Sequence, residues 1–368
     1  MLKVGKPEES LESCLKALTL KPQFLGALHN LGSALQAQGE LEEAAECFQK
    51  ALRLDPNHAK THLNQASLML VQGDFERGWE EYEWRWKTGQ LPKREFREPR
   101  WMGEPLSGRT ILLHAEQGLG DTLQFIRYAA LVKRLGARVV VECQKPLVKL
   151  LSRSQGIDQL AAQGDDVPHF DVHAPLLSLP RILRTTVNSI PADVPYLFAD
   201  PGLVDDWRER LKEQSGLRIG MNWHGRAGDG MFRRRDIPIE CLAPIAQMPG
   251  ARLVSLQKGD GRKELAGAGF PIFDPGDDVD TVHGPFMDTA AIIMNLDLVI
   301  TSDTSVPHLA GALGVPVWVA LPFVPDWRWL LNRQDSPWYP TMRLFRQKAR
   351  GDWTTVFEEI HSALCELI

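Results

Sequence analysis

Residues 296–321 have the sequence LDLVITSDTSVPHLAGALGVPVWVAL. An apolar strand leads into the polar turn 302–305, an apolar helix follows over about 306–313, Gly314 stops that helix, and a second apolar strand begins. This order predicts a βαβ unit in a parallel sheet. The turn would aim the amide-rich N-terminus of the helix at the carboxyl edge of the sheet, where open α/β sheets bind ligands and where a diphosphate would fit.

The segment before this unit predicts the rest of an α/β half over residues 216–345. LRIGMNWHGRAG at 217–228 begins as a strand, a helix is expected over 239–248, and ARLVSLQKG at 251–259 is another strand. We expect a Rossmann-like half with its ligand edge at the strand ends.

A similar half is predicted over residues 109–200. RTILLHA at 109–115 is a strand, EQGLGD at 116–121 a loop, TLQFIRYAALVKRLG at 122–136 a helix and ARVVVEC at 137–143 a second strand. Two such halves would face each other across a cleft.

The EQGLGD loop contains Gly118 and Gly120, but Leu123 stands where a dinucleotide fingerprint has its third glycine, and no GK[ST] follows. This excludes the usual Rossmann fingerprint and the P-loop. Asp121 has two interpretations: it caps the next helix, or it takes a proton from an acceptor that the two glycines allow to approach. Glu116 is a second candidate base.

The first ninety residues repeat with a period of 34, as Gly39 and Gly73 illustrate. Residues 24–58 show apolar positions at helical spacing, a glycine at the turn and a proline after the second helix. This pattern resembles the tetratricopeptide repeat, and we assign residues 1–90 to an all-α repeat module. The incomplete first copy favours an array that starts further upstream. The module is either a solvated spacer or a concave groove for a peptide or protein.

The third repeat has aromatic residues where the others are smaller, namely Trp79, Tyr82, Trp84 and Trp86. A terminal repeat must dock on something, so these residues predict a seam with the next domain. Residues 91–108, rich in proline, glycine and charge, are predicted to form a linker.

The composition is that of an ordinary globular chain, with 43% apolar residues, 24% charged residues and a net charge of -5. No basic arm is present, which argues against a nucleic-acid partner. The apolar stretches are shorter than the roughly 18 residues of a membrane span, and the N-terminus lacks a hydrophobic signal core. Five separated cysteines without a CxxC pair fit a reducing compartment, so we expect a cytoplasmic protein.

The second part of the chain resembles the glycosyltransferase family 9 domain, a family that includes the ADP-heptose:lipopolysaccharide heptosyltransferases. The resemblance is carried by the motif pair EQGLGD and SDTSVPHLAGAL, together with residues 223–259, 286–331 and 335–347. The resemblance covers residues 109–368. It implies a GT-B fold of two Rossmann-like halves, with the acceptor on the first half and the nucleotide sugar on the second.

The resemblance also implies roles for individual residues. Asp121 matches the proposed general base, and Asp303 matches the aspartate that holds the donor sugar. The other donor-binding candidates are Thr304, Ser305 and His308 at the helix start; Arg235, with Arg233 and Arg234 as competitors; Ser255, Gln257 and Lys258 at a strand end; Met287, Asp288 and Thr289 around the base; and His224.

Several of these residues have an equally simple structural interpretation. Asp303 could cap the helix after the strand, His308 could pack on the sheet, and the three arginines could lie on a solvent-facing loop. Pro307 leaves the start of the helix uncertain. The late tryptophans, including Trp327 and Trp329, either fasten the terminal helix of residues 346–368 back across the two halves or stack on a sugar.

No metal ligand set is expected. His169, Asp171 and His173 alternate as on a strand face without a fourth ligand, and the acidic loop 274–280 fails calcium spacing because Pro285 occupies its twelfth position. Inverting transfer needs a carboxylate base on one side and positive potential for the departing diphosphate on the other. Asp121 would supply the base, and Arg235 together with the N-terminus of the helix would supply the positive potential. Neither role would require a metal or another cofactor.

The sequence thus predicts a metal-independent, inverting glycosyltransferase that uses a nucleotide-diphosphate sugar, ADP-heptose-like or other. Its acceptor would be a glycan or a protein, in the latter case presented by the repeats. The alternative is a catalytically silent repeat adaptor that keeps the fold for binding.

Overall fold

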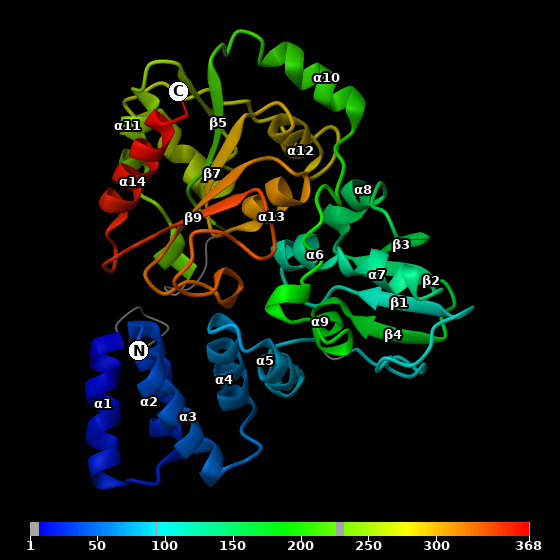
Figure 1. Cartoon of the computed structure of the whole chain (residues 1–368), viewed down its shortest axis with the longest axis vertical. Coiled ribbons are helices and arrows are strands. Elements are labelled where there is room, and N and C mark those ends of the chain that lie inside the picture. The colour runs from blue at the N-terminus through cyan, green and yellow to red at the C-terminus, as the bar shows by residue number, and fades with distance from the viewer. Residues whose placement is uncertain (1–6, 93, 226–231, 368) are drawn as a thin grey trace.

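A computed structural model describes residues 7–92, 94–225 and 232–367 and shows helical repeats followed by two parallel sheets (Figure 1). The repeats comprise α1 (Pro7–Leu20), α2 (Leu25–Gln38), α3 (Leu41–Leu54), α4 (Ala59–Val71), α5 (Phe75–Tyr82) and the 3₁₀ helix η2 (Glu83–Lys87). Each helix from α1 to α5 packs against the next one.

The glycines of the 34-residue period have a structural reason. Gly39 and Gly73 both have a φ of +84°, a left-handed conformation that ends a helix at little cost for glycine. Gly32 allows close packing, since a Cβ there would lie 2.5 Å from the Phe48 ring.

The first sheet has the strand order β3-β2-β1-β4, and all its neighbouring strands are parallel. Its strands are β1 (Thr110–His114), β2 (Arg138–Cys143), β3 (Gln159–Ala162) and β4 (Val172–Pro175). The helix predicted over 122–136 is divided into α6 (Leu119–Phe125) and α7 (Tyr128–Arg134), and it begins three residues earlier than expected. Short helices α8 (Val148–Leu151) and α9 (Leu179–Ile182) complete this half.

The second sheet has the order β6-β5-β7-β8-β9 and is also parallel throughout. Its strands are β5 (Leu217–Asn222), β6 (Ala251–Ser255), β7 (Leu298–Ser302), β8 (Val317–Leu321) and β9 (Met342–Arg346), and its helices are α11 (Ala243–Ala246), α12 (Met287–Ile293), α13 (Ser305–Ala312) and α14 (Trp353–Cys365). Helix α10 (Pro201–Arg210) follows the first half and packs on α12. In the described part of the chain, no helix has the length and apolar character needed to cross a membrane.

The segment predicted as a linker, residues 91–108, includes a stretch that is packed against the first sheet. Arg100 forms a parallel bridge with His173, the Trp101 amide donates to the His173 carbonyl at 2.8 Å, and the Trp101 side chain is buried. The repeats are therefore joined to the sheet by a short extra strand segment.

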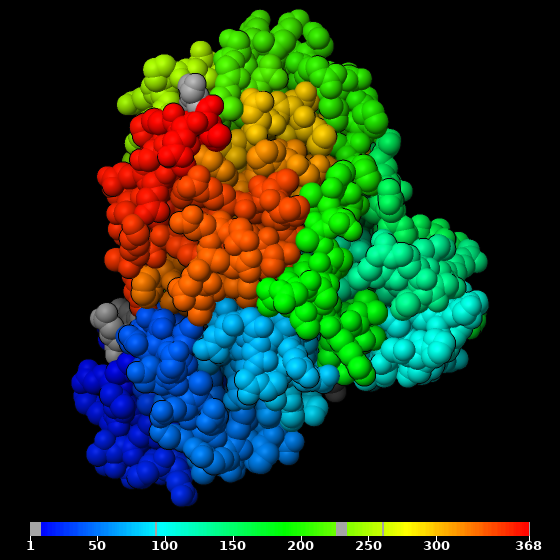
Figure 2. Space-filling model, viewed as in Figure 1, coloured from blue at the N-terminus to red at the C-terminus, as the bar shows by residue number. Residues whose placement is uncertain are grey.

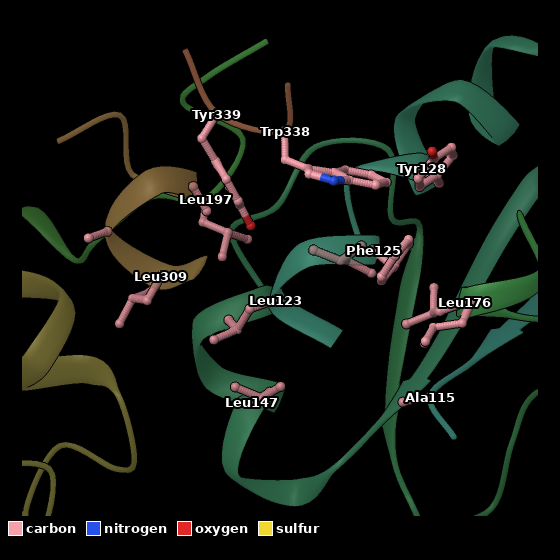
Figure 3. Packing of buried hydrophobic residues seen from close by; sticks show 14 of the residues in the cluster. Ala115, Leu123, Phe125, Tyr128, Leu147, Leu176, Leu197, Leu309, Trp338 and Tyr339 are labelled. Carbon is pink, nitrogen blue, oxygen red and sulfur yellow. The ribbon is translucent and has the colours of Figure 1, made fainter. Parts of the chain in front are cut away.

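Ring contacts form the predicted seam at two of the four aromatic residues of the third repeat. The rings of Trp79 and Tyr82 lie 5.2 and 5.9 Å from the ring of Trp327, and Trp79 also meets Phe125 of α6 at 6.2 Å. In Figure 3, Phe125 lies beneath Trp338, with their ring centroids 5.5 Å apart. One hydrophobic core therefore runs through the repeats and both halves, and the space-filling view shows the repeats in close contact with the second half (Figure 2).

The late tryptophans do not fasten the terminal helix across the two halves. Helix α14 packs on β9 and α11, in a cluster that holds residues of the second half only. Trp327 and Trp338 instead hold the second half to the repeats and to α6. Both tryptophans lie on the segment between β8 and β9, and this segment contacts the repeats at Phe75 and Trp79.

The seam makes a prediction about stability. Trp79→Ala removes an indole that is 2% exposed, and we expect it to lower the free energy of unfolding by about 3–5 kcal/mol because a cavity remains. Urea unfolding measures this change. Leu20→Ala is the control, since Leu20 is 88% exposed; an equal loss in both variants would contradict the seam.

Candidate active site

The two halves meet where α6 packs against α13. A Cβ on Gly120 would lie 3.2 Å from the His308 ring and 3.5 Å from the Ser305 Cα. Gly120 thus allows the start of α6 to approach the start of α13. The sequence instead predicted that Gly120 would allow an acceptor to approach. Figure 3 shows Leu123 of α6 and Leu309 of α13 on the same contact.

Asp121 caps α6 from its third position, as part of a capping box, and not from the position before the helix. Its Oδ2 accepts a hydrogen bond from the Gly118 amide at 2.7 Å, and its Oδ1 forms an ion pair with Arg328. Gly118 is therefore the residue before the helix, and its amide is held by the Asp121 carboxylate. Burial raises the pKa of Asp121, while Arg328 acts in the opposite direction.

Arg328 is the side chain that joins the two halves at this point. Its Nε donates to Gln124 Oε1 of α6 at 2.7 Å, and its Nη1 lies 2.8 Å from Asp326 Oδ1. The guanidinium lies 4.1 Å from the ring centroid of Trp327. Sequence reasoning missed Arg328 because the segment PDWRWLL was interpreted through its tryptophans alone; the signal was a charged residue between two aromatic ones.

Asp303 comes from the second half and faces the same charges. Burial, and next the negative charge of Asp326, raise the pKa of Asp303 to about 6, while Arg235 and Arg328 act in the opposite direction. Asp121 and Asp303, one from each half, thus both interact electrostatically with the Arg328 and Asp326 pair.

The start of α13 offers fewer amides than the sequence suggests. Thr304 Oγ1 accepts a hydrogen bond from the Val306 amide at 3.2 Å, and Pro307 has no N–H group. Of the first three helical residues, Ser305 alone has an amide that Thr304 does not cap.

His308 belongs to the core and not to a donor site. It is 4% exposed, its Nδ1 lies 3.0 Å from the Tyr339 hydroxyl, and its ring stacks on Trp329. Burial lowers its pKa well below the ordinary value, so the ring is neutral. Stacking of a sugar on Trp327 or Trp329 is also wrong, because these side chains are 5% and 0% exposed.

A cavity of about 240 Å³ lies in the second half at the end of β6. Its lining includes Ser255, Gln257, Lys258, Arg262 and Thr289. Lys258 Nζ donates to Asp280 Oδ2 at 3.0 Å, and half of its side chain is exposed. The predicted nucleotide residues Ser255, Gln257, Lys258 and Thr289 therefore share one cavity, which we call the β6 cavity.

Two of the predicted donor residues are engaged by the protein itself. Gln257 Oε1 accepts from the amides of Trp223 and His224 at 3.0 and 2.8 Å, and its Nε2 donates to the Lys258 carbonyl at 2.7 Å. The buried Asp288 accepts from Trp207 Nε1 at 2.9 Å, with further bonds from Asp280 and His283. These side chains shape the surrounding loops, and Met287 is buried beside them.

The arginines of the second half separate into different environments. A Cβ on Gly225 would lie 2.9 Å from Arg235 Nη2, so this guanidinium lies over the end of the β5 loop, and its charge acts on Asp303. Arg234 points to the repeats, with Nη1 3.5 Å from the Ala37 carbonyl. The side chain of Arg233 lies outside the described residues. His224 lies 3.5 Å from Glu264, with Nε2 facing Oε1.

Glu116, the second candidate base, is paired with a side chain of the repeats. Its side chain is 2% exposed and forms a 3.0 Å ion pair with Arg85 of η2. Burial raises the pKa of Glu116 to about 7, against the opposing effect of Arg85. Among the described residues, no group of three or more His, Cys, Asp or Glu side chains could hold a metal.

Comparison with known proteins matches the tetratricopeptide repeat family at residues 26–58. The chain is 28% identical over 312 residues to Protein FlbA of Caulobacter vibrioides, an alignment that covers 78% of this chain and 52% of FlbA. It therefore spans about half the length of that relative.

Among solved structures, a glycosyl transferase of family 9 from Veillonella parvula DSM 2008 aligns with a TM-score of 0.50 and 11% identity, over 73% of this chain and 92% of the other. ADP-heptose lps heptosyltransferase II of E. coli aligns with a TM-score of 0.48 and 14% identity, over 70% and 99%.

The contact between the halves makes a second prediction. Gly120→Ala places a methyl group 3.2 Å from His308, and we expect a loss of about 1–3 kcal/mol in unfolding free energy through overpacking. Gly267→Ala is the matched control, because a Cβ there meets nothing within 4 Å. Thermal and urea unfolding distinguish the two, and equal stability of both variants would contradict the tight α6–α13 contact.

The chain thus combines a tetratricopeptide repeat with a two-sheet fold similar to that of the family 9 glycosyltransferase structure.

Proposed function

We propose that this protein is a glycosyltransferase that moves a sugar from a nucleotide-diphosphate sugar to an acceptor hydroxyl, as the family 9 likeness implies. One observation carries the proposal. Asp121 of the first half forms an ion pair with the buried Arg328 of the second half, and Asp326 pairs with the same guanidinium. The charges of Arg328 and Asp326 also act on Asp303, and the second half contains the β6 cavity. The fold similarity supports this interpretation.

The residues suit the two sides of an inverting displacement. The acceptor oxygen attacks the anomeric carbon, and Asp121 takes the proton from that oxygen as the new C–O bond forms. The bond from the anomeric carbon to the diphosphate breaks, and the diphosphate leaves with the electron pair. Arg235 and the half-exposed Lys258 are the cations that would neutralise the leaving charge.

In this proposal, the positive potential comes mainly from side chains. Since Thr304 and Pro307 reduce the amides available at α13, side chains carry more of this role than the helix terminus does. We propose that the nucleotide base enters the β6 cavity and that Asp303 contacts the donor sugar. No step requires a metal, so a chelator should leave the rate unchanged.

The base assignment makes a third prediction. Asp121→Asn removes the proton acceptor but keeps the shape, and we expect the transfer rate to fall about 100-fold or more. Donor binding, measured as the thermal shift on addition of nucleotide-diphosphate sugars, should persist. Asp205→Asn, a carboxylate that is 69% exposed, is the control.

The outcomes separate the candidate functions. Full activity of Asp121→Asn would contradict the base assignment. If the unmodified protein neither transfers nor hydrolyses any donor, the glycosyltransferase proposal fails and the repeat adaptor is favoured. If no donor shifts the melting temperature, the donor site fails as well.

Arg328 makes a fourth prediction. Its charge favours the ionised form of Asp121, so Arg328→Gln should raise the pKa of that carboxyl. The base is active only when ionised, and the acidic limb of the pH–rate profile should therefore move to higher pH, by about one unit or more.

Arg328→Lys keeps the charge and serves as the matched variant, with a smaller expected shift. Circular dichroism and melting curves show whether each variant is folded, because removal of a buried cation leaves Asp326 without its partner. Folded variants of both kinds with unchanged acidic limbs would refute the role of Arg328.

A further inference from the structure

Gln144 follows β2 directly and holds the loop in front of α6 with both ends of its side-chain amide. Its Nε2 donates to the Gln117 carbonyl oxygen at 2.8 Å, and its Oε1 accepts from the Thr122 hydroxyl at 2.9 Å. Gln117 lies in the loop before α6, whereas Thr122 lies inside the helix, directly after Asp121. One side chain thus ties the loop to the helix on both sides of the candidate base.

The Gln117 carbonyl belongs to the same peptide group as the Gly118 amide, which donates to Asp121 Oδ2 at 2.7 Å. A peptide group is planar, so a hydrogen bond that fixes its carbonyl also fixes the direction of its N–H group. A bond accepted by the carbonyl also polarises the peptide and strengthens its N–H group as a donor. Gln144 therefore sets both the direction and the strength of the bond that holds the Asp121 carboxylate.

Tyr82 of α5 holds the side chain of the same loop residue. Its hydroxyl accepts from Gln117 Nε2 at 3.1 Å and lies 3.3 Å from Gln117 Oε1. The Tyr82 ring is buried, with its centroid 5.9 Å from that of Trp327, so the hydroxyl has a fixed position. The loop is thus held by the repeats on one side and by the end of β2 on the other.

Helix α6 does not need Gln144 in order to begin. The Thr122 amide donates to the Gly118 carbonyl at 3.2 Å, and the capping box satisfies the Gly118 amide. What Gln144 adds is a fixed orientation of the peptide that contacts the Asp121 carboxylate.

We propose that Gln144 is a positioning residue for the base, acting through the Gln117–Gly118 peptide, and that Tyr82 makes the repeats a second support of that peptide. The role of the positioned carboxylate as a base rests on the proposed function, whereas the positioning itself needs no substrate. A base contributes fully only when it is held at the right distance and angle from the proton that it takes. Loss of either support should therefore slow turnover and leave donor binding, which is proposed for the second half, unchanged.

The first test is an NMR titration of the full chain without ligand that follows the carboxyl carbon of Asp121, assigned with Asp121→Asn. Burial raises the pKa of this carboxyl, and the Gly118 amide opposes the rise. Gln144→Met keeps the length of the side chain but has no amide group. It should weaken the Gly118 bond and move the midpoint of the titration to higher pH, by about half a unit or more. Tyr82→Phe, which removes one hydroxyl group only, should move it in the same direction by less.

Matched variants separate positioning from a general effect on folding. Tyr128→Phe is the control for Tyr82→Phe, because Tyr128 is also buried and its hydroxyl donates to Thr185 Oγ1 at 3.0 Å, outside the loop before α6. Thr122→Val and Thr122→Ser form a second pair, since only serine keeps the hydroxyl that bonds to Gln144. The midpoint should rise in Thr122→Val and stay at the parent value in Tyr128→Phe and Thr122→Ser. The Tyr82 and Thr122 variants also keep the test decisive if Gln144→Met does not fold.

The Gln144 and Thr122 variants leave the charges around Asp121 as they are. The charged or titratable groups that interact electrostatically with this carboxyl are Arg328 and Asp326 of the second half, Glu116 of the loop and Tyr82 of the repeats. A higher pKa in those variants therefore reports a change in hydrogen bonding and not a change of charge.

The second test measures turnover with ADP-heptose as the donor probe. In Gln144→Met, kcat should fall about tenfold, with the KM for the donor unchanged. The acidic limb of the pH–rate profile should move to higher pH, because the base is active only when ionised. A residue that served stability alone would lower the melting temperature and leave kcat and the pH profile of the folded protein at the parent values.

The positioning role and the proposed function can fail separately. If the parent turns over no donor while the Asp121 midpoint moves as expected, the proposed function fails and the positioning role stands. If the folded Gln144→Met, Tyr82→Phe and Thr122→Val variants titrate as the parent does, or if Tyr128→Phe moves the midpoint equally, the positioning role is overturned. A midpoint that moves in Gln144→Met but not in Tyr82→Phe would overturn the part assigned to the repeats.

Discussion

The contact between the two halves of this molecule depends on the buried guanidinium group of Arg328. It pairs with Asp121 and Gln124 of the first half and with Asp326 of the second, and it lies over Trp327. A buried charge is tolerated only when its partners compensate for lost hydration, and removal of one partner from such a pair typically costs about 3–5 kcal/mol. The contact between the halves is therefore held by the same group that forms an ion pair with the proposed base. Stability and reactivity are coupled at this position.

Burial raises the pKa of both Asp121 and Asp303, but the charges around the two carboxyl groups differ. Arg328 forms an ion pair with Asp121 and opposes the rise there, whereas at Asp303 the negative charge of Asp326 adds to the effect of burial and the pKa reaches about 6. A base needs to be ionised at working pH, and a group that contacts sugar hydroxyls does not. In the proposed reaction, Arg235 and Lys258 neutralise the charge of the leaving diphosphate, because α13 presents few free amides.

The repeats are part of the same body as the two sheets. Trp79 and Tyr82 enter the common core, while Arg85 forms the buried pair with Glu116 of the first half. A module attached by a flexible linker could supply a binding surface only at a distance. Here the last turn of the repeats reaches the loop that precedes Asp121, because Arg85 pairs with Glu116. The repeats thus help to position the loop before Asp121 and also contribute to the common core.

The sequence predicted the repeats, both βαβ units, and the loops that contain Asp121 and Asp303, because helix and strand periods, turn glycines and motif spacing are local properties. It did not predict Arg328, the roles of Gly120 and His308, or the pairing of Arg85 with Glu116. Those properties depend on residues far apart in the chain: only folding brings α13 against α6 and decides which polar side chains are used by the protein and which face a cavity. Local patterns specify elements, whereas burial and charge pairing are set by the neighbours that each element acquires in three dimensions.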